Sequence, residues 1–271
     1  MSRIVTPGQY PSTRTRRRFL TMLGSIALGG LLQPVLHLRA DGEPFRVPPT
    51  LMLHPREKDE EQLPRLLRWL TENDYESILY ADLAAALRGT AELPEKPVLL
   101  TIDDLGSHYI EPPLLRMADM VEQAGHKASF GVVTRDSPDR SPRVWDRLRE
   151  LARRGFEMNT HTSRHVVLPD LESLDDLREE IIGSARMIQD GAGSRPISLI
   201  APYGAVYVRG RYRVFDQRIF DVAAEGGLSF VVGIPGGRWI DADARLPYYV
   251  GRVGVGVDHF QTRWWLEHFH E

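Results

Sequence analysis

The sequence predicts an α/β fold built on a parallel sheet, which is either open or closed into a barrel. Short apolar segments typical of buried strands alternate with amphipathic helical segments between residues 50 and 268. No internal repeat divides this region, and the 231 residues after position 40 fit a single domain of barrel size. The most notable polar side chains follow the predicted strands at their carboxyl ends, which is where such barrels carry their sites.

The elements of the first half can be assigned in chain order. Residues 41–49 are polar and contain proline, and we interpret them as a linker. The first helix is predicted from Leu63, Leu66, Leu67 and Leu70, which share one face at helical spacing. The predicted elements are a strand at 50–54, helices at 61–72 and 80–88, a strand at 97–102, a helix from Pro112 or Pro113 to Gly125, and a strand at 128–133.

The second half continues the same alternation. A charged amphipathic helix is ended by Gly155, and the spacing of Leu177, Ile181, Ala185 and Ile188 predicts a long helix after it. The predicted elements are a helix at 142–154, a strand at 156–160, a helix at 174–190, a strand at 197–200, a helix at 217–225, a strand at 228–234, one or two strands at 248–257 and a terminal helix at 260–268.

Residues 1–40 have the composition of an export signal rather than of a folded segment. The run from Thr15 to Leu20 fits the twin-arginine pattern S/T-R-R-x-F-L, and an apolar stretch continues to Leu36. Glycines and Pro34 interrupt that stretch, which suits a cleavable signal better than a membrane-spanning helix. We expect export by the twin-arginine route to the periplasm or the cell exterior. The membrane is then contacted only through this segment, if it is retained uncleaved as an anchor.

Charge and cysteine content exclude several classes of function. Residues 1–40 hold six arginines and no acid, so residues 41–271 carry 28 basic and 37 acidic side chains, a formal charge of −9. This balance argues against a nucleic-acid partner, which requires a basic surface. The chain has no cysteine, so a disulfide, a thiolate ligand and a cysteine nucleophile are all impossible. Any metal must be held by nitrogen and oxygen.

Two short stretches carry the chemistry. Asp103 and Asp104 directly follow a predicted strand, and His161 and His165 follow another at a spacing of four. Either pair alone is more often a surface feature, but the fold brings strand ends together and so strengthens both signals. Adjacent side chains on an extended strand point to opposite sides, so we expect one aspartate to face a metal and the other to face the attacking water.

These residues resemble the motifs of the polysaccharide deacetylases, also called the NodB-homology domain or carbohydrate esterase family 4. Thr101-Ile102-Asp103-Asp104 resembles the family's T-F-D-D motif, and His161-Thr162-Ser163-Arg164-His165 resembles its H-S/T-x-x-H motif. Leu51-Met52-Leu53-His54 is similar to the L-M-Y-H strand of a secreted branch that acts on poly-N-acetylglucosamine-type exopolysaccharide. The similarity extends over residues 50–255 and implies an irregular (β/α) barrel, with the catalytic domain at 50–271.

The resemblance implies a role for each site residue. Asp103 is the catalytic base, and Asp104, His161 and His165 bind a divalent metal. The backbone N–H of Tyr203 helps to hold the oxyanion. Zinc is the default metal for two nitrogens and one oxygen, and cobalt, nickel, iron or manganese also fit.

Other positions depart from the family pattern. Leu105 stands where glycine usually follows the acid pair, and Ile200-Ala201-Pro202-Tyr203 lacks the arginine of the third motif, R-P-P-Y, that orients the base. Arg252 is a candidate substitute for that arginine. The family's histidine acid aligns best with His259, while His108 is a second candidate.

The resulting prediction is an exported, metal-dependent enzyme that removes acetyl groups, most simply N-acetyl groups, from an acetylated polysaccharide. Two alternatives stay open at this point. One is a glycan-binding protein of the same fold that has lost catalysis, and the other is an esterase acting on O-acetyl groups such as those of xylan. Trp239 follows a late strand and is a candidate for lining a glycan groove.

Overall fold

The computed structural model of the protein describes residues 44–106, 113–135, 142–211, 213–234, 237–241, 244–255 and 259–268. The predicted export signal and His108 lie outside these ranges. The backbone of His259 is described, whereas its side chain is not. No helix in the described part of the chain is both long enough and apolar enough to cross a membrane.

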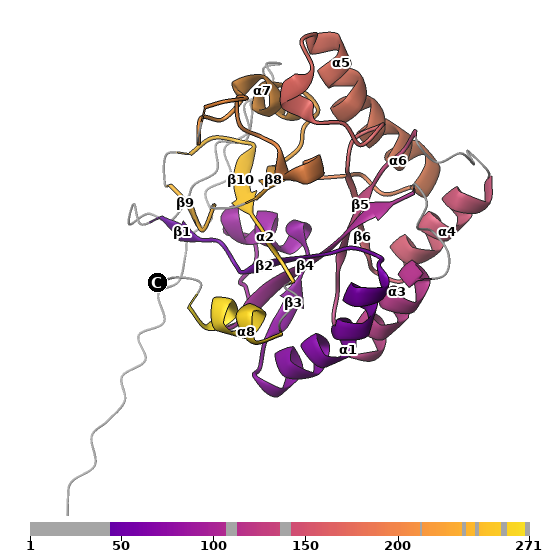
Figure 1. The fold of residues 1–271 in the computed structure, drawn as a ribbon, viewed down its shortest axis with the longest axis vertical. Helices are drawn as coiled ribbons and strands as arrows, with labels where there is room; N and C mark the ends of the chain where they lie inside the picture. The colour runs from indigo at the N-terminus through magenta and orange to yellow at the C-terminus, as the bar shows by residue number, and fades with distance from the viewer. Residues whose placement is uncertain are drawn as a thin grey trace, which may run out of the picture. The chain divides into compact units, whose positions relative to one another are not determined.

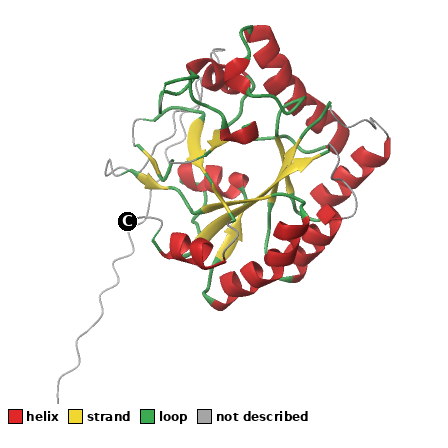
Figure 2. Ribbon diagram, viewed as in Figure 1, coloured by secondary structure: helices red, strands yellow, loops and turns green. Residues whose placement is uncertain are grey.

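A parallel sheet forms the centre of the fold, as predicted (Figure 2). Within the described ranges its strands follow the order β10-β8-β7-β6-β5-β4-β2-β11, with β3 paired to β4 at the side. The strands are β2 (Thr50–Leu53), β3 (Glu76–Ile78), β4 (Pro97–Leu105), β5 (Ser129–Val132), β6 (Glu157–Thr160), β7 (Ser198–Ile200), β8 (Phe230–Gly233), β10 (Tyr248–Gly251) and β11 (Val253–Gly254).

One short stretch of chain closes this sheet into a barrel. β10 pairs with β8 at one end of the strand order, and β11 pairs with β2 at the other. Only Arg252 separates β10 from β11, so consecutive residues join the two edges. The predicted irregular (β/α) barrel is therefore confirmed, and its closure places Arg252 among the inward-facing side chains, where it is 1% exposed.

Helices lie along the outside of the barrel (Figures 1 and 2). Apolar residues on the outer faces of β2, β4 and β5 pack against α1, α3 and α4, and those of β7 and β8 pack against α5 and α7. The helices are α1 (Glu57–Glu72), α2 (Tyr80–Leu87), α3 (Pro113–Gln123), α4 (Pro142–Arg153), α5 (Leu174–Arg178), α6 (Ser184–Ala192), α7 (Gln217–Glu225) and α8 (His259–Glu267).

The amino-terminal end of the barrel is filled by apolar side chains and covered by α2. Tyr80 and Leu83 of this helix belong to the same buried cluster as Phe230 and Leu99, which point inward from their strands. The first strand residue of β6, Glu157, accepts hydrogen bonds from the backbone N–H groups of Tyr80 and Ala81 at 3.2 and 2.8 Å. Apolar side chains thus fill most of this end, and the Glu157 carboxylate joins α2 to β6.

Several elements differ from the predicted ones. α1 begins at Glu57 rather than at residue 61, because acidic residues in its first turn stabilise the helix before the apolar repeat starts. The predicted helix at 174–190 is divided by a π-helical turn, η2 (Glu179–Gly183), in which Glu180 faces inward and is fully buried. β4 continues through Asp103 and Asp104 to Leu105 instead of ending before them.

Part of the expected linker is packed structure. β1 (Phe45–Arg46) pairs with β9 (Trp239–Ile240), and Val47 is fully buried. Two-residue strands have no periodicity to detect, so the sequence contained no signal for either of them.

Candidate active site

The acid pair lies on an irregular part of β4. The pairing of β4 with β5 shifts register between Ile102 and Leu105, and Asp104 has a left-handed φ of 61°. Asp103 Oδ2 lies 4.0 Å from His161 Nε2, and Asp104 Oδ1 lies 3.4 Å from the same atom. The expectation that strand alternation would point the two carboxylates to opposite sides was wrong. Because the bulge interrupts the alternation, both carboxylates reach the same histidine.

The two histidines are held by a loop that directly follows β6. Thr162 and His165 have φ values of 68° and 56°, a backbone conformation that residues other than glycine rarely adopt. The buried Glu180 carboxylate accepts the backbone N–H groups of Ser163 and Arg164 at 3.0 and 2.8 Å. The π-helical turn thus provides the anchor for a strained loop, and backbone strain of this kind gathers at functional sites.

Three ligand atoms converge at the carboxyl ends of the strands. His165 Nε2 lies 3.1 Å from Asp104 Oδ1 and 3.1 Å from His161 Nε2, and the third side of this triangle is 3.4 Å. Tetrahedral bonds of 2.0–2.1 Å to nitrogen or oxygen place ligand atoms about 3.3 Å apart. The three side chains therefore form a group that fits one divalent ion.

The tautomer of His161 agrees with a ligand role. Its Nδ1 lies 2.7 Å from the carbonyl oxygen of Ile200, so the proton is assigned to Nδ1 as a donor to that oxygen. The lone pair on Nε2 then points toward Asp104 and His165 and is available for a cation. A backbone carbonyl on the far ring nitrogen is the usual way in which a ligating histidine is oriented.

Arg252 holds the second carboxylate. Its Nη1 donates to Asp103 Oδ1 at 2.7 Å and to the hydroxyl of Thr101 at 2.9 Å, and Asp103 is 2% exposed. Burial alone would raise the pKa of Asp103, but the Arg252 guanidinium and then His161 outweigh it, so the pKa lies below its ordinary value. The candidate substitute for the missing third-motif arginine thus contacts the predicted base from the position between β10 and β11.

Asp104 is kept ionised in another way. Burial would raise its pKa as well, but the imidazoles of His161 and His165 beside it hold the pKa below the ordinary value of an aspartate. Arg56 Nη2 also lies 3.7 Å from its second oxygen, from a side chain that is 61% exposed. Both carboxylates are therefore anionic at neutral pH, as a ligand and a base must be.

His54 is a site residue to which the sequence analysis gave no role. It follows β2, whose pairing of Leu53 with Ile102 places His54 beside Asp103. Its charge contributes to lowering the pKa of Asp103 and of Asp104. Its backbone N–H donates to Asp59 Oδ2 at 2.7 Å. A histidine directly after a strand, at the same sheet edge as the acid pair, was the signal that could have identified it.

Tyr203 lies beside the same group. It has a φ of 59°, its side chain is 67% exposed, and its ring centroid lies 4.8 Å from that of His165. The structure thus brings Asp103, Asp104, His161 and His165 together and sets Tyr203 next to them. The predicted acid His259 is not placed, since its side chain lies outside the described residues, and the same holds for His108.

Comparison with known proteins agrees with these observations. The model of the polysaccharide deacetylase family matches residues 90–231, which is more than half of the chain. No curated protein sequence matches the chain at a significant level.

Solved structures share the fold. The deacetylase PplD of Streptococcus pyogenes, in complex with acetate, is 17% identical, with a TM-score of 0.64 over 80% of this chain and 95% of that one. The de-N-acetylase from Aggregatibacter actinomycetemcomitans is 21% identical, with a TM-score of 0.59 over 76% and 93%. The BpsB deacetylase domain from Bordetella bronchiseptica is 22% identical, with a TM-score of 0.58 over 79% and 96%.

At 17–22% sequence identity, the similarity to these three structures shows that the chain shares their NodB-type fold. The family model, by contrast, spans the acid pair, the histidine pair and Tyr203 in one continuous match. The chain belongs to the polysaccharide deacetylase family.

Proposed function

We propose that this protein is an exported, metal-dependent deacetylase that hydrolyses N-acetyl groups of a polysaccharide. One observation carries the proposal: three ligand atoms converge at 3.1–3.4 Å beside a buried aspartate that is kept ionised by an arginine. Metal-assisted hydrolysis needs this combination of an open cation site and a separate base.

Each side chain has a distinct task in this chemistry. A divalent cation, zinc by preference, would be held by Asp104, His161 and His165 and would supply Lewis acidity toward water and the acetyl carbonyl. Asp103 accepts the proton of the attacking water, and Arg252 keeps that carboxylate oriented and anionic. The backbone N–H of Tyr203 donates to the oxyanion that develops on the acetyl carbonyl oxygen.

The amine that leaves must receive a proton. We assign this step to His259, as the family resemblance implies. His54 is the alternative donor, because its pairing position beside Asp103 puts an imidazole on the same side of the barrel. Measuring acetate release by His54→Asn and His259→Asn separates the two, since only loss of the true acid lowers kcat by about 10²–10⁴-fold.

The choice of N-acetyl over O-acetyl groups is supported by the solved relatives. One neighbour is named a de-N-acetylase, and another binds acetate, which is the product common to both reactions. Acetate release from N-acetylglucosamine oligomers should therefore exceed release from acetylated xylan at equal acetyl concentration. The reverse order would assign the enzyme to O-acetyl esters.

Export is proposed from the sequence alone. The twin-arginine run at residues 15–20 supports transport of an already folded, metal-loaded protein. Fusing residues 1–40 to a reporter that is active only after twin-arginine transport tests this, with Arg16→Lys/Arg17→Lys as the matched control. A reporter that works equally well with both lysines contradicts the assigned route.

Metal removal tests the function as a whole. The purified protein should contain close to one divalent ion per chain, lose acetate release on exhaustive chelation and regain it with zinc. Activity that survives complete chelation contradicts the proposal. Stoichiometric binding of oligosaccharide without acetate release at any metal concentration would identify the alternative, a glycan-binding protein that has kept the fold.

A further inference from the structure

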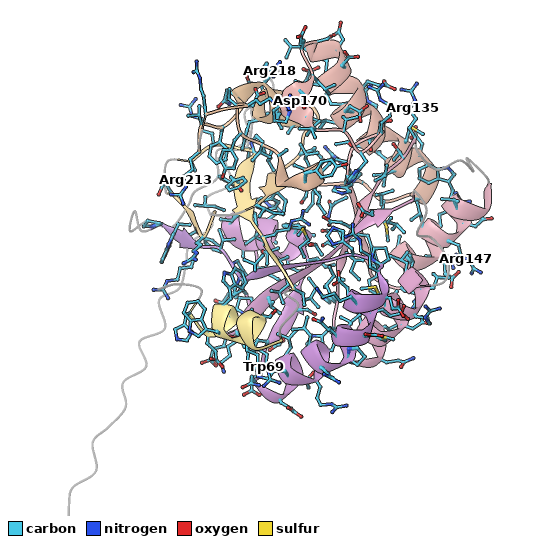
Figure 3. All side chains as sticks on the ribbon, in the orientation of Figure 1. Trp69, Arg135, Arg147, Asp170, Arg213 and Arg218 are labelled. Carbon is cyan, nitrogen blue, oxygen red and sulfur yellow. The ribbon has the colours of Figure 1, made fainter. Side chains whose placement is uncertain are left out.

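A cavity of about 730 Å³ is lined by residues between 207 and 215 and between 234 and 249, and no step of the proposed reaction uses it. Its walls come from three places: the segment 207–215, the β8–β9 region and β10. A volume of this size falls within the range of small-ligand sites, roughly 300–1,000 Å³. In Figure 3, Arg213 marks the side of the fold on which β9 and β10 lie in Figure 1.

Short contacts connect this cavity to the candidate active site. Tyr207 lines the cavity and lies only four residues after Tyr203, a span of at most about 14 Å along the chain. Gly204, next to Tyr203, packs so closely on Ile234 of the cavity wall that an added Cβ would lie 2.7 Å from it. The cavity wall therefore reaches the residue next to Tyr203, so a polymer chain that extends past Tyr203 can enter the cavity.

Aromatic side chains form one part of the wall. Tyr207 and Phe215 stack with ring centroids 4.9 Å apart, and Phe215 packs on Tyr249 at 4.8 Å. Trp239 is 43% exposed, while the Arg46 guanidinium lies 5.1 Å from its ring centroid. Exposed aromatic faces of this kind provide stacking surfaces for sugar rings.

Positively charged side chains form another part of the cavity wall. Arg211, Arg213 and Arg245 line the cavity, and within the described residues Asp241 is the only acid among the lining side chains. This excess is local, since residues 41–271 carry a formal charge of −9. The guanidinium group presents paired donors that match the oxygens of a carboxylate or a phosphate.

We propose that this cavity, which we call the arginine pocket, binds a sugar unit carrying a carboxylate or phosphate group in the polysaccharide being deacetylated. The inference rests on the proposed function and names its substrate class: an anionic polymer with N-acetyl groups. The aromatic wall stacks on the ring, and the arginines bind the acidic group. A neutral polymer of the same length uses only the aromatic wall.

Binding measurements test the pocket without relying on hydrolysis. Zinc-loaded Asp103→Asn protein is titrated with a hyaluronan tetrasaccharide, a chitin tetrasaccharide and the same chitin tetrasaccharide bearing one 6-phosphate. We expect at least one acidic probe to bind about tenfold more tightly than the neutral one, with a preference that falls as salt is added. The acidic probe that binds identifies carboxylate or phosphate as the preferred group. Equal affinity for all three probes, or no binding, overturns the proposal.

Variants distinguish binding at the arginine pocket from an effect of the protein's overall charge. Arg211→Gln/Arg245→Gln should abolish the preference for the acidic probe, whereas Arg65→Gln/Arg186→Gln, which removes the same charge from exposed positions on α1 and α6, should keep it. Trp239→Ala should weaken the acidic and neutral probes alike. A preference that survives in the pocket variant overturns the assignment. Absence of acetate release from every substrate would instead remove the proposed function while leaving this binding result intact.

Discussion

Two buried carboxylates at opposite ends of the barrel behave in opposite ways. Glu157, at the start of β6, accepts hydrogen bonds from Ser129, Asn159 and the first backbone N–H groups of α2. Burial nevertheless raises its pKa, because these neutral donors compensate only part of the desolvation. Asp103, near the end of β4, is 2% exposed, yet its pKa is lowered by the Arg252 guanidinium.

The difference shows how one fold uses a carboxylate for structure alone at one end and for chemistry at the other. Four neutral donors fix Glu157 in place and join α2 to the barrel, and they leave the carboxyl as a weaker acid. A full positive charge keeps Asp103 ionised in a site where water is scarce, which is the condition for a base. Changes at the carboxyl ends should therefore affect activity, and changes at the amino ends should affect stability alone.

The largest effect is expected at the base itself. Asp103→Asn should lower kcat for acetate release by about 10²–10⁴-fold, because the proton of the attacking water loses its acceptor. Metal content should stay near that of the wild type, since Asp104 and both histidines are intact. Asp175→Asn, a change at a side chain that is 91% exposed, is the matched control. Wild-type rates in Asp103→Asn would refute the role of this residue.

Removing the partner charge should affect both rate and stability. Arg252→Met leaves the Asp103 carboxylate buried without a cation, which costs about 3–5 kcal/mol of unfolding free energy for buried pairs. Arg252→Lys keeps a charge and should recover part of the stability and of kcat. Chemical denaturation and acetate release measure the two quantities. If Arg252→Met unfolds like the wild type, the ion pair does not hold this end of the barrel together.

The anchor of the histidine loop should control metal affinity. Glu180→Gln replaces the carboxylate that accepts the N–H groups of Ser163 and Arg164 by a neutral amide, which accepts more weakly and cannot form the ion pair with the Arg164 guanidinium, so the loop is held less firmly. We expect zinc to bind about 10–100-fold more weakly, as for other residues that orient ligands. The control is Glu179→Gln, whose carboxylate is 53% exposed and pairs only with Arg135 among the described residues. Equal zinc affinity in the two variants would show that the anchor has no role in ligand placement.

The smallest effect is expected at the amino-terminal end. Glu157→Gln should change the unfolding free energy by no more than about 2 kcal/mol and leave kcat unchanged. A raised folded pKa means that the contribution of Glu157 is complete below its ordinary pKa of 4.5 and is lost as pH rises through the folded pKa.

Wild-type stability should therefore fall relative to Glu157→Gln between about pH 5 and about pH 8, as measured by urea unfolding at both pH values. A constant difference between the two proteins would contradict the raised pKa. A lower kcat in Glu157→Gln than in the wild type would contradict the division of roles between the two ends of the barrel.

Much of the fold was accessible from the sequence. The helix at 217–225 was predicted to the residue, and most strands differ from their prediction by one or two residues, because apolar periodicity is a local property of the chain. The histidine pair was identified because it directly follows a strand, and the acid pair because it directly follows the apolar run of another. The bulge at Asp104 and the π-helical turn at Glu180 were missed, since both depend on contacts between segments far apart in sequence.

By itself, then, the sequence determined the order of strands and helices, the absence of cysteine chemistry and the residues able to hold a cation. Only the tertiary structure decided how those residues are used. Arg252 lies 149 positions after Asp103, and it became the partner of that carboxylate because barrel closure brings β11 against β2. His54 joined the site because β2 pairs with β4. The sequence sets the chemistry of each side chain. The neighbouring charge that controls its ionisation depends on which residue the fold places beside it.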